Sequence, residues 1–433
     1  MRAPGPAGHQ TGPMASFELS SLFEFLAGSP SPYHAVATAA ARLDAAGFSA
    51  IDETEAWTEL PELGYTTRGG ALIAWHRPDG LPAHAPLRII GAHTDSPNLR
   101  IKPHPDTGNA GWRQLAVEIY GGALSNSWLD RDLGLSGRIV LADGTVRLVR
   151  ADRPLARVAQ LAIHLDRDVN ERGLVLDKQV HLTPIWGLGQ VRAGHFGNWL
   201  AGLAGVADAE IAAWNLMFHD LTPPSRLGVD GELVASARLD NLCSCWCAIE
   251  ALTNAPAGEA IHVVALFDHE EVGSGSTTGA GGALLEHVLT RLAGAAGATA
   301  DDWARSMATS VCLSSDMAHA VHPNYPERHE PEHRPLPNAG PVLKVNSNQR
   351  YATDAVTATV FTQACEQAKV PWQVFVSRNN MPCGSTIGPV TATRLGIPTV
   401  DVGCAQLSMH SARELCGAQD PVFMARAMVA FLR

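Results

Sequence analysis

The sequence has no apolar run that approaches the ~20 residues a membrane-spanning helix needs. It has no lysine-rich run either, and a net charge of -11 makes nucleic acid phosphates an unfavourable partner. The first segment, Met1–Ala15, is rich in Pro and Gly and lacks the apolar core of a secretory signal. We therefore expect a cytoplasmic protein with no membrane or nucleic acid partner. Residues 1–16 are expected to be a disordered tail, with Met14 as an alternative start to Met1.

The eight cysteines include no CxxC pair. Cys243, Cys245 and Cys247 alternate along the chain, which is the wrong spacing for a tetrahedral zinc site. We interpret the cysteines as reduced, small apolar residues, which is the usual state in a cytoplasmic protein.

With 433 residues, of which 46% are hydrophobic and 17% charged, the chain has an ordinary globular composition but is long for one core. Helical periodicity over residues 17–48, interrupted by Pro30 and Pro32, predicts two helices. After residue 233, strand-like and helical runs alternate, which is typical of a doubly wound α/β/α sandwich. We expect strands at 70–75, 87–92, 261–267, 310–315, 341–345, 372–376 and 397–403, and helices at 241–252, 278–294, 354–369 and 420–432.

Residues 98–232 have a different character, with short alternating strands such as 115–120 and 136–141. Turn signals separate these strands, and no βαβ rhythm is visible. The sequence therefore predicts a discontinuous α/β domain made of residues 17–97 and 233–433. A mostly β domain, residues 98–232, is inserted into it.

Two adjacent glutamates, Glu270 and Glu271, follow the apolar run 261–267 at the expected end of a buried strand. An unpaired buried carboxylate is costly, and a bound metal cation would supply the missing partner. One glutamate could then bind metal while its neighbour, pointing elsewhere, handles a proton. The alternative is a solvated acidic loop.

Other residues of types that bind metals follow further expected strands of the α/β sheet. The carboxyl ends of such strands are the usual place where an α/β protein binds its ligand. Each has a plain alternative: a turn histidine, a helix or turn cap, or a surface histidine before a helix that begins at Ser411. One shared site explains these residues better than an unrelated structural role for each of them at its own strand end. These residues are His93, Asp95, Asp240, Asp316 and His410.

This set of ligand types suits two divalent ions. One bridging aspartate, with one histidine and one carboxylate added per ion, would hold a pair of ions ~3.5–4 Å apart. Nitrogen and oxygen ligands without a thiolate favour Zn²⁺, with Mn²⁺ or Co²⁺ possible. Asp95, two residues after His93, could orient its imidazole.

The motifs around these residues resemble the aspartyl aminopeptidase family of metallopeptidases, from about residue 17 to the C-terminus. One loop departs from the family pattern, because Asn380 stands where family members carry Asp. The motifs that carry the resemblance are 93–97 (HTDSP), 127–133 (SWLDRDL), 161–165 (LAIHL), 236–241 (SARLDN), 268–274 (DHEEVGS), 315–319 (SDMAH), 346–351 (NSNQRY), 382–389 (PCGSTIGP) and 409–411 (MHS).

The resemblance implies a dizinc exopeptidase that removes N-terminal Asp or Glu from peptides through a metal-bridging water. It implies that the inserted domain forms dimers, which build a tetrahedral homododecamer. Asp240 would bridge the two ions, with His93 and Asp316 on one ion and Glu271 and His410 on the other. It implies that Glu270 is the general base and that Asp95 orients His93. Tyr351 would contact the oxyanion, as would His164 from the other subunit of the dimer. Lys344, Gly384 and Ser385 would bind the substrate.

Two other functions remain open on the sequence alone. The same dimetal site could hydrolyse an N-acyl amino acid or a carboxypeptidase-type peptide. The chain could also be a catalytically idle, self-assembling peptide-binding protein, although an intact Glu270 and a full ligand set argue against this. Lys344 has its own alternative, an ordinary solvated lysine, and His164 could be a core or surface histidine of the inserted domain.

Overall fold

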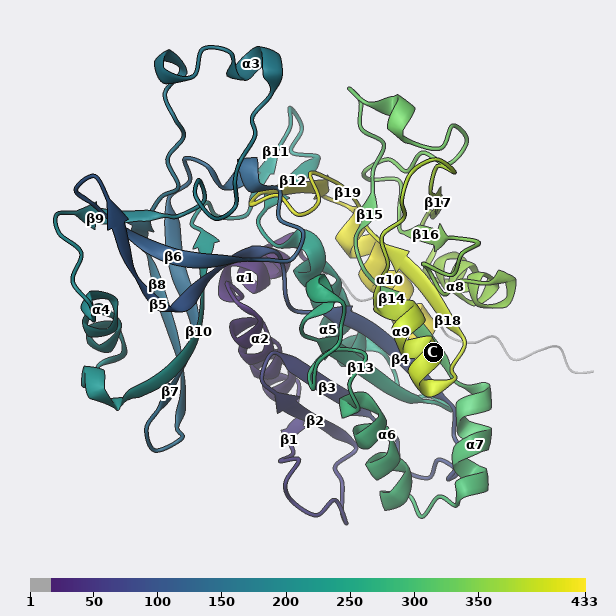
Figure 1. The fold of residues 1–433 in the computed structure, drawn as a ribbon. Coiled ribbons are helices and arrows are strands. Elements are labelled where there is room, and N and C mark those ends of the chain that lie inside the picture. The colour runs from purple at the N-terminus through teal and green to yellow at the C-terminus, as the bar shows by residue number, and fades with distance from the viewer. Residues whose placement is uncertain (1–16) are drawn as a thin grey trace, which may run out of the picture.

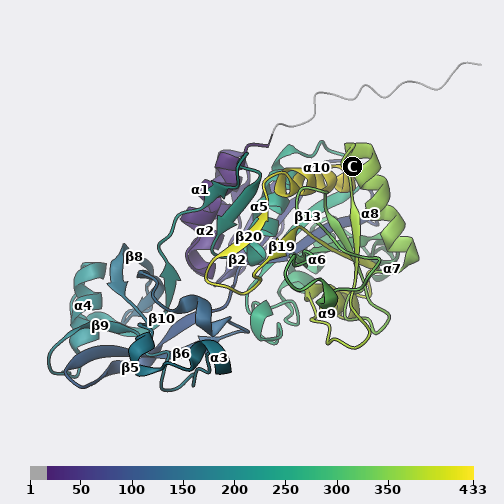
Figure 2. The same cartoon turned by 90° about the horizontal axis from the view of Figure 1, so that it is seen from above.

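The computed structural model describes residues 17–433 (Figures 1 and 2). The expected tail over residues 1–16 and the alternative start at Met14 lie outside the described residues. A nine-stranded sheet runs through the larger part of the molecule, in the order β1-β2-β3-β13-β4-β14-β18-β16-β17. Its four central strands are parallel: β13 (Ile261–Phe267), β4 (Leu87–His93), β14 (Val311–Ser315) and β18 (Thr399–Gly403).

The outer strands make the sheet mixed, because β3 pairs antiparallel with β13 and β16 pairs antiparallel with β18. On one side lie β1 (Ser49–Ala50), β2 (Leu63–Arg68) and β3 (Ala71–His76), and on the other β16 (Val342–Val345) and β17 (Gln373–Val376).

Helices cover both faces of this sheet. Along β13, Val264 and Leu266 pack into one hydrophobic core while Val263 and Ala265 pack into the other, as the alternation of a strand requires. The predicted doubly wound sandwich is confirmed, and α7 and α9 are helices that we did not predict. The first core holds α1 (Leu19–Gly28), α2 (Pro32–Ala45), α5 (Leu239–Asn254), α8 (Ala355–Ala368) and α10 (Asp420–Leu432), and the second holds α6 (Leu284–Ala295), α7 (Ala300–Thr309) and α9 (Ile387–Leu395).

The two N-terminal helices divide where the prolines predicted. α1 ends at Gly28, and α2 starts at Pro32, whose fixed φ suits the first helical position. Ser31 caps α2, because its hydroxyl accepts the backbone N–H of His34 at 3.4 Å.

A separate antiparallel sheet of six strands lies beside the sandwich and has its own hydrophobic core (Figure 2). α4 (His195–Ala204) packs against it, and the segment that carries α3 (Val169–Arg172) extends away from the rest of the molecule (Figure 1). In spatial order the strands are β8 (Val146–Ala156), β7 (Leu133–Leu141), β10 (Ile211–Asp220), β5 (Asn98–Asn109), β6 (Trp112–Tyr120) and β9 (Ile185–Leu188).

A third sheet of five short strands joins distant parts of the chain. It corrects one prediction, because the segment after Ser411 forms a strand, β20, and not a helix. Main-chain pairing of β20 with β12 and β19 outweighs the local preference for a helix. In spatial order the strands are β11 (Ser225–Leu227), β12 (Leu233–Ser236), β20 (Glu414–Gly417), β19 (Ala405–Leu407) and β15 (Ala318–His319).

All eight cysteines have unpaired thiols, and all except Cys383 are buried, as the sequence predicted. Between residues 17 and 433, none of the helices combines the length and the apolar character that crossing a membrane requires.

Candidate metal centre

Three strands that lie side by side in the nine-stranded sheet carry predicted ligands at their carboxyl ends. β4 ends at His93, the turn Glu270–Val272 follows β13, and Asp316 follows β14. His269 and Gly273 flank that turn with φ of 63° and 96°, so the chain bends sharply around the two glutamates. Because β13 and β14 both pair in parallel with β4, their ends meet at one edge of the sheet.

Asp240 and His410 reach the same place from another sheet. Asp240 lies just after β12, at the start of α5, and His410 lies between β19 and β20. The prediction that every ligand follows a strand of the α/β sheet is therefore wrong for these two residues, because β12, β19 and β20 belong to the five-stranded sheet.

The carboxylate of Asp240 lies between two histidine rings. Its Oδ1 is 3.4 Å from Nε2 of His93, and its Oδ2 is 3.8 Å from Nε2 of His410. Asp316 Oδ1 lies 3.5 Å from the same His93 atom, and Glu271 Oε2 lies 3.3 Å from the same His410 atom. The result is two triplets that share Asp240, each with its ligand atoms within 4.8 Å of one another: His93 with Asp240 and Asp316, and Asp240 with Glu271 and His410.

The triplets fit divalent cations. Oδ1 of Asp240, Oε1 of Glu271 and Oδ1 of Asp316 are buried and accept no hydrogen bond from the described residues. Buried carboxylate oxygens need a partner, and a cation bound between them would be one. Imidazole nitrogens and carboxylate oxygens without a thiolate form a donor set that suits zinc, manganese or cobalt.

Glu270 stands beside the triplets, with its Oε2 3.9 Å from His93 Nε2. It also forms a third grouping of potential ligand atoms with His93 and Glu271. Burial raises the pKa of Glu270 to about 8, and the carboxylates of Asp316 and Asp240 add to the rise while His93 opposes it. A carboxyl group with a pKa near neutrality is suited to proton transfer.

Hydrogen bonds to carbonyl oxygens orient both histidine rings. Nδ1 of His93 lies 2.9 Å from the backbone oxygen of Asp95, and Nδ1 of His410 lies 3.2 Å from that of Gly122. Because a carbonyl oxygen can only accept, each Nδ1 donates, which leaves the Nε2 lone pair free for a metal.

Asp95 contacts His93 mainly through its backbone, since its carboxylate Oδ1 is 3.4 Å from the ring. That carboxylate accepts the backbone N–H groups of Glu270 and Glu271, both at 3.1 Å, and the hydroxyl of Tyr120 at 2.6 Å. Asp95 therefore fixes the glutamate turn as well as the histidine.

Glu414 is a residue of the centre that the sequence reasoning missed. Its carboxylate accepts the backbone N–H of Asp240 at 2.9 Å and that of His410 at 2.7 Å, so one buried side chain holds two ligand segments. A glutamate four residues after His410 was the only signal available in the sequence.

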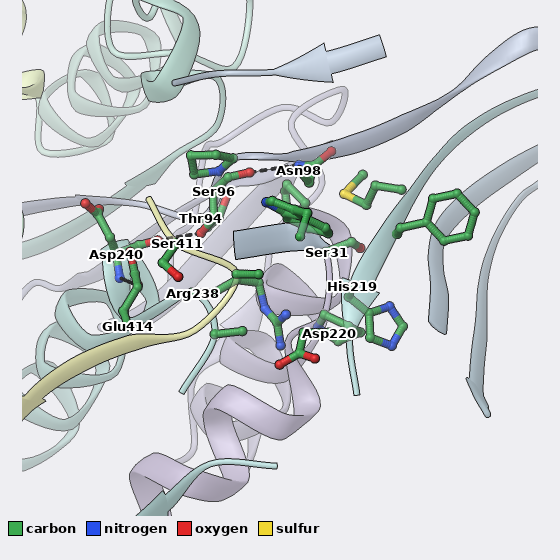
Figure 3. A pocket seen from close by; sticks show the side chains of 18 residues that line it. Ser31, Thr94, Ser96, Asn98, His219, Asp220, Arg238, Asp240, Ser411 and Glu414 are labelled. Carbon is green, nitrogen blue, oxygen red and sulfur yellow. Dashed lines mark hydrogen bonds between the residues drawn. The ribbon is translucent and has the colours of Figure 1, made fainter. Parts of the chain in front are cut away.

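Figure 3 shows a pocket of about 20 Å³ behind the centre, where β10 of the six-stranded sheet meets the sandwich. Asp240 and Glu414 line one end of it, and Asp220 lies at the other. Ser96 donates from its hydroxyl to the backbone oxygen of Asp240, while the Asp240 carboxylate points away from this pocket. The main chain of Asp240 is thus anchored from behind, on the side opposite the histidines.

In front of the triplets lies a pocket of about 530 Å³, which Lys344, Tyr351, Gly384 and Ser385 also line. The alternative of a solvated lysine is wrong, because Lys344 is only 2% exposed and its Nζ lies 3.7 Å from Asp316 Oδ2. Burial opposes ionisation of Asp316, but Lys344 and His93 hold its pKa below the usual range. Lys344 also lies 5.4 Å from the centroid of the Tyr351 ring.

His93, Asp95 and His164 are the predicted site residues that do not line this pocket. His93 and Asp95 lie behind its wall in contact with the triplets, whereas His164 lies elsewhere. It lies in the short 3-10 helix Ile163–Leu165 of the six-stranded-sheet segment and is exposed. The structure therefore excludes the alternative of a core histidine.

A comparison with protein families shows which family this chain belongs to. The model of the family "Aminopeptidase I zinc metalloprotease (M18)" matches residues 25–432. The chain belongs to the M18 family. The resemblance to the aspartyl aminopeptidases and the prediction of a zinc aminopeptidase are thereby confirmed. The alternatives of an N-acyl amino acid hydrolase and of an idle binding protein receive no support.

This M18 chain is 60% identical over 417 residues to a Streptomyces coelicolor protein described as a probable M18 family aminopeptidase 2, with 95% of this chain and 96% of that one covered. It is similar to a chain of the cryo-EM structure of the Ape4 and Nbr1 complex, with a TM-score of 0.92 and 35% identity over 96% of this chain and 85% of that one. It is also similar to the S. cerevisiae mApe1 dodecamer, with a TM-score of 0.84 and 28% identity over 95% of each chain.

Proposed function

We propose that this M18 aminopeptidase removes acidic residues, Asp or Glu, from the N-termini of peptides. The observation that carries the proposal is the buried ammonium group of Lys344 in the wall of the 530 Å³ pocket. Among the described residues that line this pocket, Lys344 is the only lysine or arginine. A substrate carboxylate that enters the pocket would find in it a cation shielded from water, where charge-assisted hydrogen bonds are strong.

We assign one ion to His93, Asp240 and Asp316 and a second to Asp240, Glu271 and His410. Two zinc ions per subunit are proposed, with manganese or cobalt as substitutes, because the donor atoms are all nitrogen and oxygen. When bound, divalent ions at these positions supply Lewis acidity to the scissile carbonyl and acidify the attacking water.

In this proposal Glu270 is the general base, which takes a proton from the attacking water and returns it to the leaving amine. Its place beside the triplets, in neither of them, supports this role. Asp95 holds His93 and the glutamate turn in position, and Tyr351 donates to the developing oxyanion. Gly384 and Ser385, which also line the pocket, contact the substrate.

We further propose that residues 98–232 form a dimerisation domain and that dimers assemble into a dodecamer. Apolar side chains of the segment that extends from the six-stranded sheet are exposed, among them Leu161 at 63%, Leu165 at 74% and Val175 at 79%. Apolar groups gathered on a protruding segment are typical of a protein interface. The similarity to a dodecameric aminopeptidase supports the same assembly here.

His164 lies between two of these apolar residues, Leu161 and Leu165. If the segment packs against a second subunit, His164 can reach the metal pocket of that subunit and donate to the oxyanion there. We infer a cytoplasmic enzyme, because its thiols are unpaired.

The substrate proposal is tested by Lys344→Met. The ratio of kcat/KM for Asp-p-nitroanilide to that for Leu-p-nitroanilide should favour Asp in the natural enzyme, and the variant should lose that preference. Lys369→Met, which removes the same charge from the C-terminal end of α8, should leave the ratio unchanged. An Lys344→Met enzyme with the original ratio would refute the assignment, and turnover of N-acetyl-Asp in place of Asp-p-nitroanilide would refute the aminopeptidase chemistry.

A further inference from the structure

The segment Tyr120–Gly122 leaves the six-stranded sheet at the end of β6 and passes beside the metal centre. Tyr120 is buried, and its hydroxyl donates to Oδ2 of Asp95 at 2.6 Å, which is shorter than the 3.1 Å bonds that this carboxylate accepts from backbone N–H groups. Since Asp95 also holds His93 through its carbonyl oxygen, Tyr120 is one residue removed from a ligand.

A second side chain of the same sheet fixes the Tyr120 ring. The guanidinium of Arg100, in β5, stacks 3.5 Å from the ring centroid. Its Nε and Nη2 atoms are buried and have no hydrogen-bond partner among residues 17–433, so packing on the ring is the contact that places this cation.

Gly121 and Gly122 lie close to Glu271 and His410, the proposed ligands of the second ion. Gly121 has φ of 71°, and a Cβ there would lie 3.1 Å from Cβ of Glu271. A Cβ on Gly122 would lie 3.1 Å from Nδ1 of His410, the same atom that donates to the Gly122 carbonyl. Any larger residue would therefore displace Glu271 or His410.

The segment thus contacts both histidines of the centre, His93 through Asp95 and His410 directly. We propose that Tyr120 and Gly122 are positioning residues of the metal centre, and that each sets the orientation of a histidine on a different ion. This rests on the two ion sites of the proposed function. It makes the six-stranded sheet part of the shell that supports the metals, in addition to any role in assembly.

The first test is Tyr120→Phe in the full-length, assembled protein, with zinc affinity measured by competition with a chelator. Loss of the hydroxyl should weaken binding of one of the two zinc ions by ~10-fold, the lower end of the effect of removing a direct partner of a metal-bound histidine, because Tyr120 acts on His93 through Asp95. Tyr65→Phe is the matched control, because Tyr65 also donates to an aspartate, Asp44, at 2.8 Å, in a contact that touches no ligand. The control should bind both ions as the natural protein does.

A purely structural role for Tyr120 would lower the unfolding midpoint and leave zinc affinity unchanged, and that result would overturn the proposal. If Tyr120→Phe does not fold, Gly122→Ala provides the test, because its added methyl group meets only the His410 ring. Gly122→Ala should weaken the binding of one ion. Gly202→Ala, in α4 beside the six-stranded sheet and with open space around it, should weaken the binding of neither. Two tightly bound ions in Gly122→Ala would overturn the role of Gly122.

These outcomes separate the inference from the proposed function. A natural protein that binds two zinc ions, together with variants that bind them equally well, would overturn the positioning role alone. A natural protein that binds no zinc would overturn the ion sites themselves, and the inference with them.

Discussion

Glu270 Oε2 lies 3.9 Å from Nε2 of His93, yet Glu270 belongs to neither of the two triplets that share Asp240. The two neighbouring glutamates therefore diverge, since Glu271 turns toward His410 and Glu270 turns toward His93. A short turn thus places a ligand and an unused carboxylate in one pocket, which is the arrangement that a metal-assisted hydrolysis with a separate base requires.

Glu270→Gln should lower kcat by ~10²–10⁴-fold, because the amide keeps the shape of the side chain but cannot accept the proton. Bound metal, measured by elemental analysis, should stay at the natural level. Glu286→Gln, on the exposed side of α6, is a suitable control and should retain full activity. Near-normal turnover by Glu270→Gln would show that another group is the base.

Asp240→Ala should lose both ions, since each triplet depends on one of its two oxygens. Asp316→Ala removes a carboxylate from only one triplet and should lose a single ion. Metal content per subunit, measured after the same dialysis, distinguishes the two variants. Retention of two ions by Asp240→Ala would disprove the bridging assignment.

His164→Ala and Glu270→Gln should each be inactive alone but recover part of the activity when their subunits are mixed. Dissociation and reassembly would create some sites that pair an intact Glu270 with an intact His164 from the other subunit. Activity is followed with Asp-p-nitroanilide, and assembly with light scattering. A correctly reassembled mixture without activity would place His164 outside the partner's site.

Asp420 should make folding depend on pH. Burial raises the pKa of Asp420 to about 7, although its carboxylate accepts the backbone N–H groups of Asn338 and Gly340. In the unfolded chain the pKa of an aspartate is about 3.9, so the folded state holds the proton more tightly and loses stability as pH rises between these values.

The urea midpoint of the natural protein should therefore fall relative to that of Asp420→Asn between pH 5 and pH 8, at fixed protein concentration. Asp301→Asn, on the exposed first turn of α7, should show no such trend relative to the natural protein. A constant difference between Asp420→Asn and the natural protein across this range would contradict the raised pKa.

The sequence was sufficient to predict the central strands and the candidate ligands at their ends that the structure brings together. β13 is buried along its whole length, from Ile261 to Phe267, so it appears in the sequence as a mostly apolar run, interrupted only by His262, before Asp268. The same reasoning located His93 and Asp316, because a polar residue directly after a buried strand is easy to detect.

The five-stranded sheet could not be predicted in the same way. Its strand β19 spans only Ala405–Leu407, which is too short for a periodic pattern, and pairing with distant segments stabilises it. The contacts of Glu414 and Tyr120 were missed for a related reason. Glu414 is 174 residues from Asp240, and no local signal links a glutamate to a backbone amide that far away.

The division of the ligands between two sheets has a consequence for the stability of the whole molecule. An ion bound by Asp240, Glu271 and His410 ties β13 of the large sheet to the segment between β19 and β20, and so acts as a cross-link between them. Because such an ion binds only the folded chain, free zinc at a hundred times its dissociation constant would add about 2.7 kcal/mol to the free energy of unfolding. The melting temperature of this enzyme should therefore report the zinc supply of its surroundings, and metal starvation would shorten its lifetime as well as stop its catalysis.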